Sequence, residues 1–124
     1  MQKMKPTPTQ DRMTTLEITI KQAINAEVKK STSFEQNGEI YRGTVSSASV
    51  AIISYSLRSF DQEDETGHID GTFEAELLIS RPCQAGEDFG EMIAPYSTKE
   101  TSFSLEMLNG KVHDVIIETP IKLL

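Results

Sequence analysis

An alternation of apolar and polar residues from His68 to Ser80 constrains the fold more than any other part of this sequence. The residues on one side of an extended chain are Ile69, Gly71, Phe73, Ala75, Leu77 and Ile79. Those on the other side include Asp70, Thr72, Glu74 and Glu76. Successive side chains of a strand point to opposite faces, so a period of two is typical of a half-buried strand. We therefore expect a long strand with one apolar face and one face that carries carboxylates.

A second alternating stretch, from Val50 to Phe60, precedes the first. Its two sides are formed by Ala51, Ile53, Tyr55 and Leu57 and by Ser54, Ser56 and Arg58. The acidic segment 61–67 joins the two stretches. Two alternating runs with a short polar connection predict an antiparallel hairpin.

Size and charge limit the classes of protein to which the chain can belong. Residues 1–12 are polar and contain two prolines, which predicts a disordered N-terminal arm. The remaining residues, 13–124, suit a single domain, and Met13 stays open as an alternative start. The formal net charge of -7 argues against nucleic-acid binding, which needs a basic surface. It favours a basic protein partner, or serves solubility alone.

The sequence carries no sign of export or membrane insertion. Its first residues, MQKMKPTPTQDR, lack the apolar core of a signal peptide. No apolar run approaches the ~20 residues of a membrane-spanning helix. Cys83 is the single cysteine, so no internal disulfide can form, which favours a reducing compartment. We expect a cytoplasmic protein that does not enter membranes.

Two segments have patterns that fit both a helix and a strand. In 14–30, the capping-box spacing of Thr14 and Glu17 favours a helix, as does the spacing of four between Ile20, Ile24 and Val28. The alternation of Leu16, Ile18 and Ile20 favours a strand. In 97–108, Ser97 and Glu100 have capping-box spacing, whereas Phe103, Leu105 and Met107 alternate. Asn109-Gly110 then ends either a helix or the first strand of a hairpin.

The other segments are less ambiguous. Asn37-Gly38 predicts a turn before a short strand from Glu39 to Val45. Residues 81–96 contain two prolines and two glycines and are typical of a loop. The stretch from Val112 to Thr119 is apolar and β-branched, which predicts a strand.

We find no motif that predicts catalysis, a cofactor or a metal ion. His68, His113 and Cys83 lie far apart and lack the spacing of zinc ligands. Asp61, Glu63 and Glu65 alternate like a calcium loop, but the glycine comes one place late and the terminal acidic residue is missing. No nucleophile, base or phosphate-binding loop follows from the sequence. We therefore expect a binding protein and not an enzyme, with its few aromatic residues in the core.

Three short motifs, in order along the chain, resemble the SecB family of export chaperones. They are Lys30-Ser31-Thr32-Ser33-Phe34-Glu35, Phe73-Glu74-Ala75-Glu76-Leu77, and Ala94-Pro95-Tyr96 with Lys99-Glu100. The resemblance implies that 15–35 is mainly a long first strand and that 97–108 is a helix. The implied fold is an α+β domain: an antiparallel sheet of four or more strands with a C-terminal helix packed on one face.

The same resemblance implies a function. SecB-like proteins are homo-oligomers, dimers of dimers, that hold unfolded polypeptides in apolar grooves without ATP. Glu35 and Glu76 align with family acids that face a partner protein, and no residue is assigned to polypeptide binding. One extra residue between Tyr96 and Glu100, and the lack of a further helix and acidic tail, favour a smaller SecB-like chaperone, such as those of toxin–antitoxin systems.

A second function fits the sequence without this resemblance. An acidic inhibitor or immunity-type protein binds one folded basic partner stoichiometrically. The acidic face from Asp61 to Asp70 would be its docking surface, because complementary charge speeds association.

Overall fold

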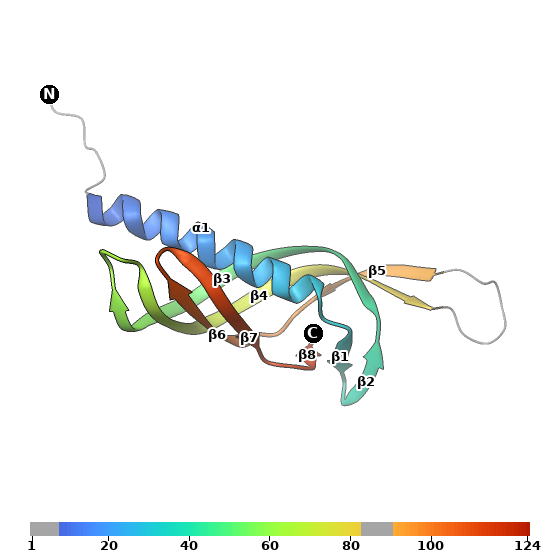
Figure 1. The fold of residues 1–124 in the computed structure, drawn as a ribbon. Helices are drawn as coiled ribbons and strands as arrows, with labels where there is room; N and C mark the ends of the chain where they lie inside the picture. The colour runs from blue at the N-terminus through green and yellow to red at the C-terminus, as the bar shows by residue number, and fades with distance from the viewer. Residues whose placement is uncertain (1–7, 83–90) are drawn as a thin grey trace, which may run out of the picture.

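The computed structural model describes residues 8–82 and 91–124, with side chains over 15–81 and 92–124. Within these ranges one N-terminal helix is followed by eight strands in two sheets (Figure 1). The elements are α1 (Pro8–Lys29), β1 (Ser33–Gln36), β2 (Glu39–Arg42), β3 (Thr44–Asp61), β4 (Thr66–Pro82), β5 (Glu91–Ser97), β6 (Thr101–Leu108), β7 (Lys111–Ile117) and β8 (Ile121–Lys122). Of the expected N-terminal arm, residues 1–7 lie outside the described residues, and 8–12 belong to α1. Cys83 also lies outside the described residues.

The segment 14–30 is helical, and the strand implied for 15–35 by the SecB resemblance is wrong for all but its last residues. Leu16, Ile20, Ile24 and Val28 are buried at a spacing of four and form the apolar stripe of α1. The capping box at Thr14 is also wrong, because the helix already begins at Pro8, a favoured residue in a first turn. The helix ends after Lys29, a cation next to the negative end of its dipole.

The predicted hairpin is confirmed. Strands β3 and β4 pair antiparallel along almost their whole length, with Ile52 opposite Phe73. The apolar side of β4 is buried as its alternation predicts, and Ile69, Phe73 and Ile79 have no exposed surface. Three irregularities in β3 bend the strand, because a bulge inserts a residue that has no partner.

The helix expected over 97–108 is wrong, because these residues form the end of β5 and the whole of β6. Phe103, Leu105 and Met107 are buried and alternate with more exposed residues, which is the strand pattern. Asn109 and Gly110 have φ angles of 52° and 80°. Two positive φ angles suit the two-residue turn of a hairpin, and this turn joins β6 to β7.

The SecB-like fold predicted from the sequence is therefore wrong. The larger sheet has five strands, in the order β3-β4-β6-β7, with β5 paired to the far end of β4. The helix that covers it comes from the N-terminus of the chain, not from the C-terminus. The loop expected over 81–96 contains β5. A small second sheet has the order β2-β1-β8, so β1 pairs with both β2 and β8.

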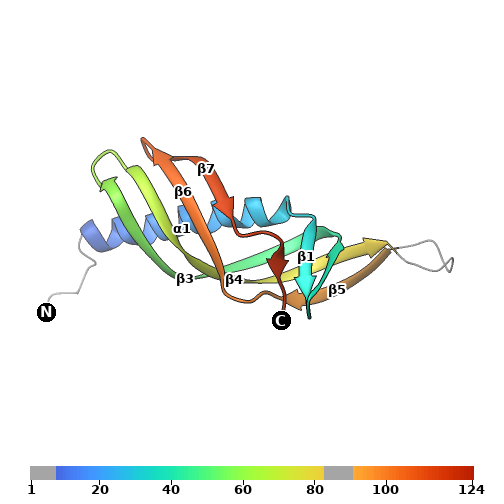
Figure 2. The ribbon, with the colours of Figure 1, turned by 90° about the horizontal axis from the view of Figure 1, so that it is seen from below.

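The larger sheet curls around α1. The helix backbone comes closest to the outer strands β3 and β7, not to β4 and β6 between them. In Figure 2 the four strands lie in front of α1, which covers only their far face. The core fills the space between, and Phe34, Ile121 and Leu123 join it from the small sheet. Because the helix lies in this trough, each of its flanks meets one outer strand.

Candidate functional site

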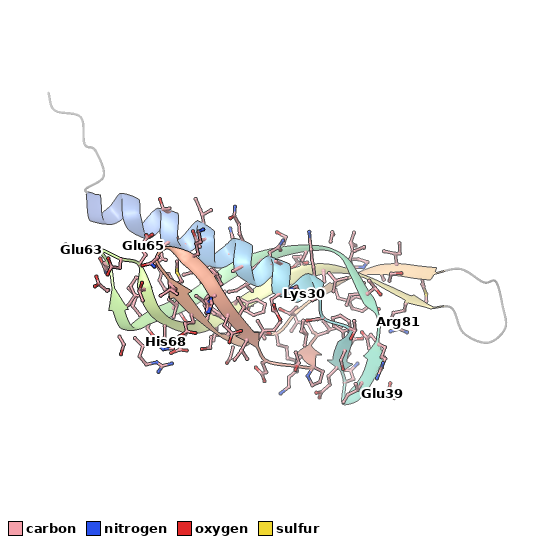
Figure 3. The ribbon with its side chains drawn as sticks, in the orientation of Figure 1. Lys30, Glu39, Glu63, Glu65, His68 and Arg81 are labelled. Carbon is pink, nitrogen blue, oxygen red and sulfur yellow. The ribbon has the colours of Figure 1, made fainter. Side chains whose placement is uncertain are left out.

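One hollow lies between the C-terminal half of α1 and the outer strand β7. We call it the β7 groove; it has a volume of about 480 Å³. Its lining residues are Glu27, Lys30, Ser31, Thr32, Ser33, Val115, Ile116, Ile117 and Thr119. Volumes of this size are typical of sites that bind small molecules or a few side chains of a peptide. Figure 3 shows Lys30 where α1 passes into β1.

One wall of the β7 groove is apolar and adjoins an unpaired strand edge. Val115 is half-buried and Ile117 is buried, and both point toward α1. The Ile116 side chain is 63% exposed and lies on the opposite face of the sheet, beside its partner Ser104, so Ile116 borders the groove only at the strand edge. In the described part of the chain β7 pairs only with β6, so its other edge has free backbone donors and acceptors. Lys30 lies 3.8 Å from Glu27 at the opposite wall. The groove therefore combines apolar surface, hydroxyl groups, one ion pair and a strand edge.

A second groove follows the other flank of α1, along β3. We call it the β3 groove; it consists of two adjoining hollows of about 240 and 250 Å³ that share Lys21. The helix contributes Glu17, Ile18, Lys21, Gln22 and Asn25, and the strand contributes residues 48–52. Ile18 is 51% exposed because it lies off the buried stripe of the helix.

Two polar groups in or near the β3 groove, Asn25 and Tyr55, have unusual surroundings. The Oδ1 atom of Asn25 is buried and, within the described residues, has no hydrogen-bond partner. Burial, and then the charge of Glu17, raise the pKa of the Tyr55 phenol. Glu17 thus lies near Tyr55, whereas Asn25, further along the helix, lies beside Ala48. The helix α1 and the strand β3 therefore run in opposite directions.

Glu35 and Glu76, the predicted partner-binding residues, lie in different sheets. Glu35 is in β1, where its backbone oxygen accepts a hydrogen bond from Leu123. Glu76 is on the open face of β4, where Oε2 accepts a hydrogen bond of 2.8 Å from the Ser97 hydroxyl. Neither residue lines the β7 groove or the β3 groove. A role of the two glutamates in one docking site stays a prediction.

The acidic segment before β4 forms a turn at the end of the β3–β4 hairpin. The Asp61 carboxylate accepts hydrogen bonds from the backbone nitrogens of Glu63 and Asp64, at 2.9 and 3.4 Å. Figure 3 shows Glu63 and Glu65 at this end of the molecule, far from Lys30. No group of three His, Cys, Asp or Glu side chains in the described ranges could hold a metal ion. The carboxylate of Asp61 thus stabilises the turn.

An ion pair on the open face of the sheet joins Arg58 to Asp70. The Arg58 Nε donates a hydrogen bond of 2.9 Å to Asp70 Oδ2. This hydrogen bond, followed by one from Ser104, lowers the pKa of Asp70 below its ordinary value of 3.8. Next to it, His68 Nε2 lies 3.9 Å from Glu106. Arg58 therefore partly neutralises the negative charge that the sequence predicts for the open face of β4.

We expect Asp70→Asn to lower the melting temperature slightly at pH 7 and to have no effect at acidic pH. Because the pKa of Asp70 is lower in the folded state, its contribution is present above the ordinary pKa and is lost as the pH falls through the folded value. The effect is small because both side chains are largely exposed. Melting curves of both proteins between pH 7 and pH 2 test this, with Glu74→Gln as a control. A difference that persists at the acidic end would contradict it.

A cluster of aromatic rings joins the small sheet to the far end of β4. The Arg81 guanidinium lies 4.2 Å from the centre of the Tyr41 ring, and the Tyr41 ring lies 6.5 Å from that of Tyr96. Burial, and then the neighbouring Tyr96, raise the pKa of Tyr41. These contacts fix the two sheets together, and Figure 3 shows Arg81 at this junction.

The groove residues were not identified from the sequence. The sequence identifies Ile116 only as part of a predicted apolar strand, and Ile18 only as part of a segment that fits both a helix and a strand. No helix in the described ranges is long and apolar enough to span a bilayer. No known family model, curated protein or solved structure matches this chain.

Proposed function

We propose that this protein is a cytoplasmic, ATP-independent polypeptide-binding protein that holds unfolded segments in the β7 groove. The observation that supports this proposal is the combination of an apolar wall at Val115 and Ile117 with the unpaired edge of β7. The groove lies between elements far apart in the sequence, so it exists only in the folded protein. No covalent step, cofactor or metal is part of the proposal.

An extended segment would add to β7 as a further strand. Its backbone would exchange hydrogen bonds with the β7 edge, and alternate side chains would enter the groove. The apolar wall would stabilise these side chains by ~25 cal/mol for each Å² removed from water. Backbone groups and apolar area are common to all unfolded chains, so this mode of binding gives low sequence selectivity.

Charge would add a preference for basic segments. The protein has a formal net charge of -7, which attracts positively charged chains over a distance. Within the groove, Glu27 lies 3.8 Å from Lys30, so a basic side chain of the client would compete for the Glu27 carboxylate.

The test is the binding of a reduced, carboxymethylated polypeptide, which cannot fold, labelled with a fluorophore. We expect the protein to bind this probe and to suppress the aggregation of an unrelated unfolding protein. Ile116→Lys should weaken probe binding by about tenfold or more, because a lysine on the outer strand opposes the addition of a further strand.

Leu108→Lys provides the matched control. Leu108 is 49% exposed, as an apolar residue of the neighbouring strand β6, but it does not line the groove. We expect this variant to bind the probe as the unsubstituted protein does. Equal losses in both variants, or no binding by either protein, would contradict the proposal. Salt-sensitive one-to-one binding of a single folded basic protein would instead support the inhibitor function.

A further inference from the structure

We propose that a second copy of this chain pairs with the free edge of β3 and forms a two-fold symmetric dimer. This inference uses the opposite side of the trough from the β7 groove, so it does not depend on the proposed function. Three features indicate that the partner is a second copy: the edge of β3, the charges on α1 and the buried Asn25 oxygen in the β3 groove.

The edge of β3 lacks charge and proline, two of the features that normally prevent strand addition, and it is regular between its bulges, from Ser47 to Ile52. Among the described residues β3 pairs only with β4, and it is the longest strand, with 18 residues. No charged residue and no proline occurs from Gly43 to Leu57, the longest uncharged stretch in the sequence. Other outer strands differ: β7 carries Lys111 and Asp114, and β5 carries Pro95. A long uncharged edge binds another strand readily, and native proteins usually cover it.

Antiparallel pairing of β3 with its own copy brings no like charges together. With a two-fold axis near Ala51, Val50 lies opposite Ile52 of the second copy. The regular part of β3 between its first two bulges, from Ser47 to Ile52, contains no charged residue. The pairing extends both sheets across the axis, so two curled sheets become one continuous sheet.

The charges on α1 are complementary about the same axis. In the β3 groove Glu17, Ile18 and Lys21 lie beside Ala51 and Ile52. An axis near Ala51 therefore passes close to the turn of α1 between Ile18 and Lys21. The rotation places Glu17 of each copy near Lys21 of the other and brings the two Ile18 side chains together. The interface then contains two reciprocal ion pairs around an apolar contact, which is typical of an isologous dimer.

The β3 groove also contains a buried hydrogen-bond acceptor to which an incoming strand can donate. The Oδ1 atom of Asn25 is buried and has no hydrogen-bond partner within the described residues. Buried polar groups are nearly always hydrogen-bonded, and an incoming strand brings backbone N–H groups into this groove. A strand of the second copy thus pairs the edge of β3, fills the groove and can satisfy Asn25.

The test measures the mass of the full chain in solution by analytical ultracentrifugation over a range of concentrations. We expect a dimer of twice 13.8 kDa. Ala51→Lys should weaken dimerisation by about a hundredfold or more, because it brings two like charges together at the axis. Ser102→Lys adds the same charge on the open face of the inner strand β6 and should leave the dimer intact.

Charge exchange on the helix tests the register. Glu17→Lys alone and Lys21→Glu alone should each weaken the dimer, and the double exchange should restore it. A protein that is monomeric at every concentration would overturn the proposal, as would a dimer that Ala51→Lys does not affect. A dimer lost in Ile116→Lys but kept in Ala51→Lys would place the interface at β7 and would equally overturn it. A monomer that still binds the unfolded probe would leave the proposed function standing.

Discussion

Phe73→Ala should lower the free energy of unfolding by about 3–5 kcal/mol, the range found when a large buried aromatic residue is truncated. Phe73 has no exposed surface and lies in the middle of β4, the strand with neighbours on both sides. Its ring lies 6.3 Å from that of Phe103, and Ile52 is its partner on β3. The substitution therefore leaves a cavity where three strands meet. Urea denaturation followed by far-ultraviolet circular dichroism measures the change.

Glu74→Ala is the matched control for this substitution. Glu74 follows directly in the same strand but points to the exposed face. We expect a change within about 0.5 kcal/mol, as for most surface substitutions. Similar losses in the two variants would show that Phe73 and Glu74 do not lie on a buried and an exposed face of β4.

The β3–β4 hairpin could be predicted because its sequence contains one consistent period. Both strands alternate over more than ten residues, and the connection between them is short and polar. A period of two over this length fits no helix. The bulges, which shift the register of β3 at three places, are not apparent from the alternation. Because of the bulge between Ile52 and Ser54, Ala51 and Ile53 are exposed, and their predicted place on the same side as Tyr55 and Leu57 is wrong.

The segment 97–108 shows why local signals can mislead. Ser97 and Glu100 have the spacing of a capping box, but a capping box stabilises a helix by satisfying only a few backbone groups. Phe103, Leu105 and Met107 bury three large side chains in the strand, which is worth more. The resemblance to SecB rested on short motifs and favoured the weaker of these two signals.

Tertiary packing decides whether the segment 14–30 forms a helix or a strand. Its threonines and Ile18 suit a strand, and its stripe of four apolar residues suits a helix. The sheet buries that stripe completely, since Ile20, Ile24 and Val28 have no exposed surface. Burial against a surface that the rest of the chain supplies overrides the weak preference of single residues.

The grooves could not be predicted from local patterns. The β7 groove joins 27–33 to 115–119, and the β3 groove joins α1 to 48–52. Such contacts appear only when the position of α1 in the trough is known. The one signal that the sequence does carry is the uncharged stretch from Gly43 to Leu57, in a chain where a quarter of the residues are charged.

Gly71→Val should lower the free energy of unfolding by about 3 kcal/mol or more. Gly71 lies on the buried face of β4, opposite Tyr55 of β3 and Phe103 of β6. A Cβ atom there would collide with the backbone oxygen of Ser54, and would lie 2.8 Å from the Cα of Tyr55 and 2.9 Å from the Phe103 ring. Two of these obstacles are backbone atoms, so no change of rotamer can relieve them.

The reason for a glycine at this position lies in the curl of the sheet. The ring of Phe103 and the backbone of β3 both approach β4 at Gly71, next to the bulge of β3 between Ile52 and Ser54. A side chain would force β3 away from β4 and widen the trough, so Gly71→Val should also weaken the packing of the helix. Gly38→Ala is the control: nothing lies within 4 Å of its added Cβ, and only the strain of its φ of 83° remains, about 1 kcal/mol. Urea denaturation compares the two. A Gly71→Val protein as stable as Gly38→Ala would show that β3 does not approach β4 so closely, and that the curl of the sheet has another cause.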